Sequence, residues 1–254
     1  MKAPVVVIGM GEIGAVFARA LLKTGHPVYP LLRNESTTEL QNSIDAPAAV
    51  IVAVGEKELP EVLKQIPAEW QSMLVLLQNE LLPRDWVQLE VAPTVISIWF
   101  EKKKGQDSKV IIPSPAYGPI SQLLHDALAS IDIAVKLVET DEAMLSELVV
   151  KNLYILTSNI AGLEVGGNVG ELWKNHRDVA NEVIDDVLLI QQQLSGQDLN
   201  KDELVELMLV AFNGDPEHKC MGRSAPARLQ RALDQAAEFG IELKKLPQIQ
   251  AKAG

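Results

Sequence analysis

The stretch VVVIGMGEIGAVFARALLKTG, residues 5–25, decides the fold. Its first four residues are β-branched and apolar, which is typical of a buried strand. Three glycines follow in the spacing GxGxxG, and apolar side chains then recur at helical intervals until Gly25, a residue type that commonly ends helices. The stretch therefore predicts a strand, a tight turn and a helix, in the order with which a βαβ unit begins.

Each glycine of the turn has its own expected role. Gly9 permits the tight turn, Gly11 lets a pyrophosphate approach the backbone, and Gly14 lets the helix pack closely on the strand. The start of the helix offers unpaired N–H groups and the positive end of its dipole to an anion. A glycine-rich structural turn would also fit the bare pattern, but its place between a strand and a helix favours dinucleotide binding. The residues expected to bind the cofactor here are Gly9, Met10, Gly11, Glu12, Ile13 and Gly14.

The end of the second predicted strand indicates which dinucleotide binds. A site for NAD would place Asp or Glu there to accept the ribose hydroxyls, whereas this sequence has Arg33, whose guanidinium suits a 2′-phosphate. Asn34, Ser36 and Thr37 could donate further hydrogen bonds. Glu35 would oppose a phosphate if it pointed inward, and Arg33 could instead be a solvated side chain at a strand end. The pattern favours NADP as the cofactor.

Strand and helix patterns alternate over residues 1–140, which predicts an α/β fold with a doubly wound parallel sheet of Rossmann type. The further predicted strands are 27–32, 49–54, 73–78, 94–98, 109–112 and 133–137. After residue 140 the strand patterns nearly vanish and long helical periodicities dominate. We therefore expect an NADP-binding Rossmann domain at 1–140 and an all-helical C-terminal domain at 141–254.

Composition and charge exclude several classes of function. The chain has 254 residues and a net charge of −11, which argues against binding to nucleic acid or to an anionic membrane surface. No apolar run approaches the roughly 20 residues of a membrane span, and the apolar start at 3–11 is too short for a signal peptide. Cys220 is the single cysteine, and no HExxH or similar spacing occurs, so we expect no disulfide and no metal site. A cytoplasmic enzyme or binding protein is expected.

The segment VVKNLYILTSNIAG, residues 149–162, predicts a largely apolar helix with an unusual polar ribbon. On a helical period Asn152 and Asn159 share one stripe, and Lys151 and Ser158 form the stripe beside it. Taken alone, the helix would explain Lys151 as a snorkelling side chain, with its stem packed and its ammonium in water. The helix pattern by itself therefore assigns no function.

Several segments together resemble the ketopantoate reductase (2-dehydropantoate 2-reductase) family, in the same order along nearly the whole chain. They are IGMGEIG at 8–14, GHPVYPLLR at 25–33, LQNE at 77–80, KNLYILTSNIAG at 151–162, NVGEL at 168–172, HKCM at 218–221 and FGIELKKLP at 239–247. That family reduces a 2-oxo acid with NADPH. The resemblance implies an NADP-dependent oxidoreductase that converts a small, 2-dehydropantoate-like 2-oxo acid to the 2-hydroxy acid. The helical domain could also support a homodimer.

The resemblance assigns roles to three residues. Lys151 falls at the position of the family's catalytic lysine and Asn159 at that of a substrate-binding asparagine. Asn79 matches an asparagine placed near the nicotinamide and the substrate, so it is expected to contact both. An ammonium suits the reaction because hydride addition leaves negative charge on the carbonyl oxygen, which a cation can stabilise and protonate.

The sequence departs from the family's pattern at three places. Ser224 stands where the family carries an acidic residue, Lys219 or Cys220 where it carries a substrate-binding serine, and Glu80 where its motif has glycine. Arg223 could instead pair with a substrate carboxylate. Two other functions stay open: an NADP-binding relative that acts as a sensor or partner subunit, and another β-hydroxyacid-type dehydrogenase.

Overall fold

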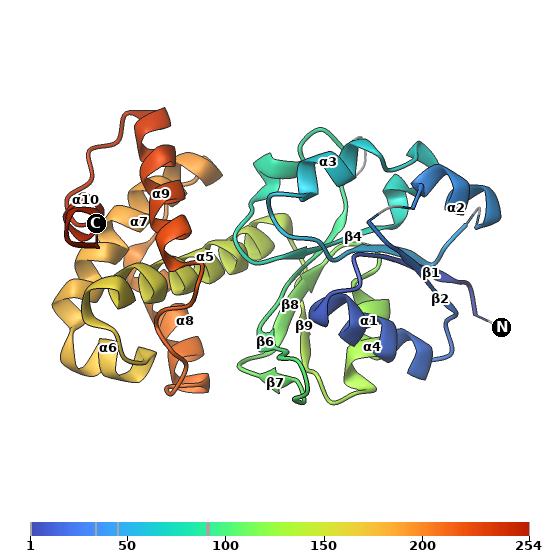
Figure 1. Ribbon diagram of the computed structural model, residues 1–254, viewed down its shortest axis with the longest axis horizontal. Coiled ribbons are helices and arrows are strands. Elements are labelled where there is room, and N and C mark those ends of the chain that lie inside the picture. Colours follow the sequence, from blue (N-terminus) through green and yellow to red (C-terminus); the bar gives the residue numbers. More distant parts are fainter. Residues whose placement is uncertain (1, 34, 45, 90–91, 254) are drawn as a thin grey trace. The chain divides into compact units, whose positions relative to one another are not determined.

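The computed structural model describes residues 2–33, 35–44, 46–89 and 92–253 (Figure 1). The chain divides into two compact units, Met1–Glu147 and Leu148–Gly254. Helix α5 (Asp141–Val165) contains the point of division, so that its first residues belong to the first unit. The boundary expected at 140/141 lies at the start of this helix.

The first unit is built on a seven-stranded sheet with the strand order β2-β1-β3-β4-β5-β8-β9. These strands are β1 (Val5–Ile8), β2 (Val28–Leu31), β3 (Ala49–Val52), β4 (Leu74–Gln78), β5 (Thr94–Ser97), β8 (Ser114–Tyr117) and β9 (Val135–Leu137). Neighbouring strands are parallel except β5 and β8, which are antiparallel. The predicted Rossmann-type sheet is confirmed. Because β2 and β3 flank β1 on opposite sides, the carboxyl ends of β1 and β3 form the switch point at which such sheets bind ligands.

Two strands differ from those predicted. The pattern at 109–112 forms only β7 (Lys109–Val110), which pairs with β6 (Phe100–Glu101) in a separate two-stranded sheet. Pro113 follows closely and lacks the backbone N–H that a longer strand would donate. Strand β8, which the sequence did not predict, contains Pro115 and lacks the β-branched run that marks β1 and β3.

Helices cover both faces of the sheet in the first unit. Figure 1 shows α1 (Glu12–Lys23) and α4 (Ser121–Ala129) on one face, and α2 (Thr37–Ser43) and α3 (Leu59–Lys64) on the other. Two short 3-10 helices, η1 (Ala68–Met73) and η2 (Pro83–Trp86), complete this unit. Alternate residues of β1, Val5 and Val7, are buried against Phe17 and Leu21 of α1. Burying one such side chain contributes about 1.5–3 kcal/mol, so this packing holds the glycine turn between β1 and α1 in place.

The second unit is helical in its described residues. It contains the rest of α5, then α6 (Val169–Asn175), α7 (Arg177–Ser195), α8 (Lys201–Gly214), α9 (Ala225–Phe239) and α10 (Leu246–Ala253). Asp186, buried in α7, accepts backbone hydrogen bonds from Lys244, Lys245 and Leu246 at 2.7–3.1 Å. This carboxylate satisfies the N–H groups at the start of α10 and ties the C-terminal helix to α7.

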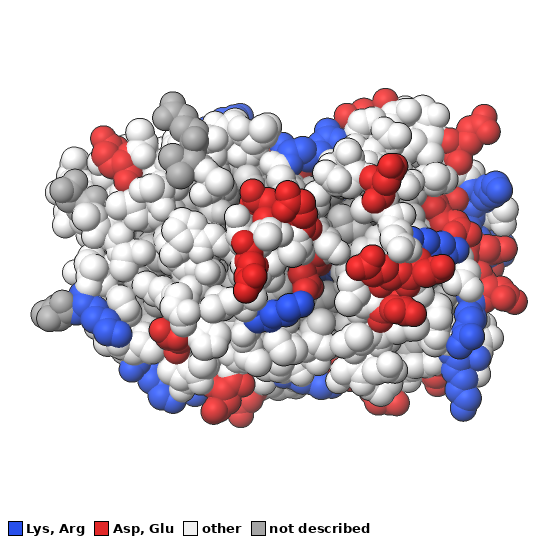
Figure 2. Space-filling model, turned by 180° about the vertical axis from the view of Figure 1, so that it is seen from behind, with Lys and Arg blue, Asp and Glu red and all other residues white. Residues whose placement is uncertain are grey.

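Acidic side chains dominate the charge of the molecule. The face displayed in Figure 2 shows groups of Asp and Glu with Lys and Arg scattered among them, in keeping with the net charge of −11. Within the described ranges, no helix is both long and apolar enough to pass through a bilayer.

Candidate functional site

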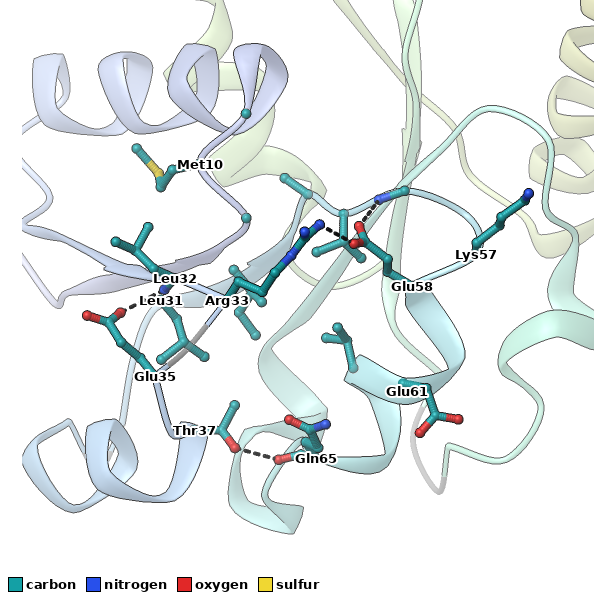
Figure 3. Close-up of a pocket in the computed structure, with 17 residues that line it drawn as sticks. Met10, Leu31, Leu32, Arg33, Glu35, Thr37, Lys57, Glu58, Glu61 and Gln65 are labelled. Carbon is teal, nitrogen blue, oxygen red and sulfur yellow. Dashed lines mark hydrogen bonds and ion pairs between the residues drawn. The ribbon is translucent and has the colours of Figure 1, made fainter. Parts of the chain in front are cut away.

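A cavity of about 600 Å³ opens at the switch point of the sheet (Figure 3). Its walls come from the carboxyl ends of β1, β2 and β3, from the glycine turn and from α3. A volume of this size is within the range of small-molecule and cofactor sites. The residues that line the cavity include Gly9, Met10, Gly11, Arg33, Glu35, Lys57, Glu58 and Glu61.

The three glycines of the turn are required for different reasons. Gly9 has a φ of +91°, and a Cβ at this position would lie 2.5 Å from the carbonyl oxygen of Ala53. A Cβ at Gly14 would lie 2.1 Å from the carbonyl oxygen of Gly9, so neither glycine can be replaced without moving backbone. A Cβ at Gly11 would meet no atom of the described part of the chain within 4 Å. The fold therefore needs Gly9 and Gly14, whereas the bare backbone at Gly11 leaves space for a ligand.

The start of α1 is suited to an anion. Gly11 is the N-cap residue and has no side chain with which to satisfy the N–H groups of the first turn. Gly9, Met10 and Gly11 line the cavity, whereas the other three predicted residues of the turn do not. Ile13 packs against the hydrophobic core, and the side chain of Glu12 is exposed in the first turn. The part of the turn that a dinucleotide could touch is therefore Gly9 to Gly11, together with the N–H groups that follow.

Arg33 lies at the carboxyl end of β2 and forms an ion pair across the cavity with Glu58, the residue before α3 (Figure 3). The second carboxylate oxygen of Glu58 accepts a hydrogen bond from the backbone N–H of Gly55 over 3.4 Å. The side chains of Arg33 and Glu58 are 84% and 48% exposed. An ion pair in such contact with water contributes at most about 1 kcal/mol, so a stronger partner can displace Glu58 from the guanidinium.

The hydroxyl groups that follow Arg33 are used within the chain. Thr37 donates a hydrogen bond to the carbonyl oxygen of Gln65 over 2.8 Å, and the hydroxyl of Ser36 accepts one from the backbone N–H of Glu39, which caps α2. Asn34 lies outside the described residues. Of the described polar side chains expected around a 2′-phosphate, Arg33 and Thr37 line the cavity, but the Thr37 hydroxyl already donates its proton to Gln65.

Lys151 lies on α5 in the second unit, and its side chain is buried, with an exposed fraction of 6%. Its ammonium nitrogen is 5.6 Å from the centroid of the Tyr154 ring, within the range of a cation–π contact. The snorkelling explanation requires an ammonium in open water, and the low exposure argues against it. A buried ammonium acts strongly on nearby charge because little water screens it.

Asn159 is held by an arginine that the sequence analysis did not identify. Arg228 of α9 donates a hydrogen bond to the side-chain oxygen of Asn159 over 2.9 Å, whereas Arg223, the arginine considered from sequence, is exposed. Arg228 falls on the stripe of α9 that includes the buried residues Ala225 and Leu229. An arginine at helical spacing from buried apolar residues is the sequence signal that could have revealed it.

Four other residues that the sequence singled out do not line the cavity. Asn152 donates a hydrogen bond to Gln191 of α7 over 2.8 Å, which indicates a structural role. Asn79 is half-buried just after β4 and does not line the cavity. Cys220 is fully buried, and burial, followed by the charge of Glu171, raises the pKa of its thiol to about 12. Ser224 is exposed immediately before α9.

Comparison with known proteins rests on structure, because no protein-family model and no curated protein matches the sequence. The dimeric ketopantoate reductase of Staphylococcus aureus is 15% identical with a TM-score of 0.65, and the match covers 99% of this chain and 100% of that one. A probable 2-dehydropantoate 2-reductase of Bacillus subtilis is 14% identical with a TM-score of 0.67, with 98% of each chain covered. The chain has the ketopantoate reductase fold.

The same fold is found with a different activity. D-mandelate dehydrogenase, solved in complex with NADH, is 13% identical with a TM-score of 0.64, and the match covers 98% of this chain and 96% of that one. The ketopantoate reductase fold therefore confirms the predicted arrangement of a Rossmann-type unit followed by a helical one.

Proposed function

We propose that this chain is a divergent member of the ketopantoate reductase family and reduces a small 2-oxo acid to the 2-hydroxy acid with NADPH. The observation that carries the proposal is the cavity at the β1/β3 switch point, in which Gly11 leaves open space beside the start of α1. A bound nicotinamide dinucleotide would supply the hydride.

The residues of the cavity fit such a cofactor. The N–H groups at the start of α1 would receive the pyrophosphate, which a side chain at position 11 would obstruct. Arg33 would bind the 2′-phosphate of NADP, because a guanidinium forms charge-assisted, often bidentate hydrogen bonds with phosphate oxygens. Such a bond is worth about 1.5–3 kcal/mol, more than the exposed ion pair with Glu58 contributes.

The polar residues of α5 would act on the substrate. The ammonium of Lys151 would stabilise the negative charge that develops on the carbonyl oxygen and donate the proton that completes the hydroxyl group. Asn159 and Arg228, which already contact each other over 2.9 Å, would hold the substrate carboxylate. Asn79 is proposed to contact the nicotinamide and the substrate.

The proposal is tested by following NADPH oxidation with a panel of 2-oxo acids, using the wild-type protein and Lys151→Met. Methionine keeps the length and apolar stem of the side chain but removes the charge. We expect kcat to fall at least about 100-fold, the scale of general acid and electrostatic catalysis, while the Kd for NADPH stays within about twofold. Lys174→Met, at an exposed position of α6, is the matched control. Normal turnover by Lys151→Met would refute the assigned role.

A cofactor-binding protein without catalysis is the second candidate. It is favoured by two observations at positions where the family carries polar groups: Ser224 is exposed and Cys220 is fully buried. In the same experiment, tight NADPH binding without turnover of any 2-oxo acid in the panel would select this function. Because the Staphylococcus aureus ketopantoate reductase is dimeric, we also propose a homodimer, which analytical ultracentrifugation can test.

A further inference from the structure

The described residues that line the cavity carry one more negative charge than positive charges. Three carboxylates line it, Glu35, Glu58 and Glu61, against the two cations Arg33 and Lys57. Figure 3 shows the Arg33 side chain extending to Glu58, while Lys57 points away from this pair. The guanidinium best placed for a 2′-phosphate is thus already paired with a carboxylate.

Glu58 differs from the other two carboxylates in what it contacts. Glu35 accepts a hydrogen bond from the backbone N–H of Leu32 over 2.7 Å, and Glu61 pairs with Lys64 over 2.6 Å. Glu58 alone among the three pairs with Arg33 in the described structure. Its second oxygen is also within 3.4 Å of the backbone nitrogen of Gly55, which holds the carboxylate on the cavity side of the loop before α3.

We propose that Glu58 is a specificity-determining residue of the cofactor site, because it competes with the 2′-phosphate of NADP for the guanidinium of Arg33. The inference rests on the proposed function. When NADP binds, its 2′-phosphate must displace Glu58 from Arg33, and this cost lowers the affinity for NADP. NAD carries a hydroxyl at that position and leaves the ion pair intact. Glu58 therefore lowers the preference of the site for NADP over NAD.

The proposal is tested by measuring the Kd of NADPH and of NADH by equilibrium fluorescence titration, without substrate, for the wild type and Glu58→Gln. Glutamine keeps the size of the side chain and removes its charge. We expect the Kd of NADPH to fall about three- to fivefold, the scale of an exposed ion pair, and the Kd of NADH to stay within about twofold. The Arg33 side chain is largely exposed and that of Glu58 about half exposed, so the substitutions are compatible with folding.

Two further variants identify the cause. Glu61→Gln removes the same charge from the same cavity without touching Arg33, and we expect both Kd values to stay within about twofold. In the Arg33→Ala background, where there is no guanidinium to compete for, Glu58→Gln should change the Kd of NADPH by less than about twofold. Together these results would attribute the effect to the Arg33–Glu58 pair.

Several results would contradict the role proposed for Glu58, and one would contradict the proposed function instead. Equal changes for NADPH and NADH, equal effects of Glu58→Gln and Glu61→Gln, or weaker NADPH binding by Glu58→Gln would overturn the role of Glu58. The role of Glu58 would also be overturned if the ratio of the NADPH and NADH Kd values were the same in Glu58→Gln as in the wild type, even while Arg33→Ala still weakens NADPH binding. If the wild-type protein binds neither dinucleotide, the proposed function itself fails.

Discussion

The guanidinium of Arg228 donates a hydrogen bond to the side-chain oxygen of Asn159 over 2.9 Å and so joins α9 to α5. If these two residues hold the substrate carboxylate, Arg228→Leu should raise the KM for the 2-oxo acid at least about tenfold, because a charge-assisted hydrogen bond is worth about 1.5–3 kcal/mol. Steady-state kinetics at saturating NADPH measure this effect.

A purely structural role for Arg228 predicts a different result. In that case Arg228→Leu would lower the midpoint of thermal unfolding and leave the KM of the remaining folded protein unchanged. Arg223→Leu, at an exposed position five residues earlier in the same segment, is the matched control and should alter neither quantity.

Gly14→Ala should destabilise the first unit severely. The added Cβ would lie 2.1 Å from the carbonyl oxygen of Gly9, and backbone in a packed turn cannot move away at low cost. We expect the free energy of unfolding to fall by at least about 3 kcal/mol in urea titrations. Gly11→Ala, which adds the same methyl group into open space, should cost less than about 1 kcal/mol. Similar losses for both variants would contradict this division of roles.

Cys220 should be inert in the folded protein. Its thiol is fully buried and its pKa is raised to about 12, so the reactive thiolate is scarce at neutral pH. We expect an aromatic disulfide reagent to react at least about 100-fold faster in denaturant than under native conditions at pH 8. Rapid reaction of the native protein would show that the segment around Cys220 opens readily.

The stability of the second unit should decrease in acid partly through Glu164. A hydrogen bond from Lys252 at 2.6 Å and an ion pair with Lys245 at 3.1 Å lower the pKa of this carboxyl against the opposing effect of its burial. Because its folded pKa is below the unfolded value, the stabilisation is present above the unfolded pKa and is lost as the pH falls through the folded pKa. Glu164→Gln should therefore cost about 1–2 kcal/mol at pH 7 and progressively less below about pH 4.

Chemical denaturation at several pH values measures that difference. Asp198→Asn, in an exposed loop, serves as the control and should follow the wild type throughout. A constant difference between Glu164→Gln and the wild type from pH 7 to about pH 3 would show that the carboxylate charge is not the cause.

Local sequence patterns predicted the features of the fold that arise locally. The four β-branched residues of β1 and the spacing of Gly9, Gly11 and Gly14 carry their own conformational preferences, so the strand, the turn and the start of α1 were predictable. The same patterns failed for β8, whose Pro115 weakens the strand signal and whose antiparallel pairing with β5 depends on the rest of the sheet. Pairing across a sheet is set by tertiary context.

The contacts within the candidate site depended still more on tertiary structure. The spacing of residues indicated that Gly11 and Arg33 belong to one type of site, and the structure brings both into the walls of one cavity. The spacing of residues did not indicate the Arg33–Glu58 ion pair, whose members are 25 positions apart in the sequence. Nor did it indicate the hydrogen bond between Arg228 and Asn159, which are 69 positions apart. Such contacts join elements whose arrangement is fixed only when the whole unit folds.

Nucleotide binding by Gly11→Ala shows whether this cavity holds a nicotinamide dinucleotide, because the described structure gives no internal reason for glycine at this position. The measurement is the Kd of NADPH by fluorescence titration, with the free energy of unfolding of each protein determined in parallel. We predict saturable binding by the wild type and a Kd at least about tenfold higher for Gly11→Ala, with its stability within about 1 kcal/mol of the wild type. Equal affinity in the two proteins, or no binding by the wild type, would contradict the assignment of this cavity to a nicotinamide dinucleotide.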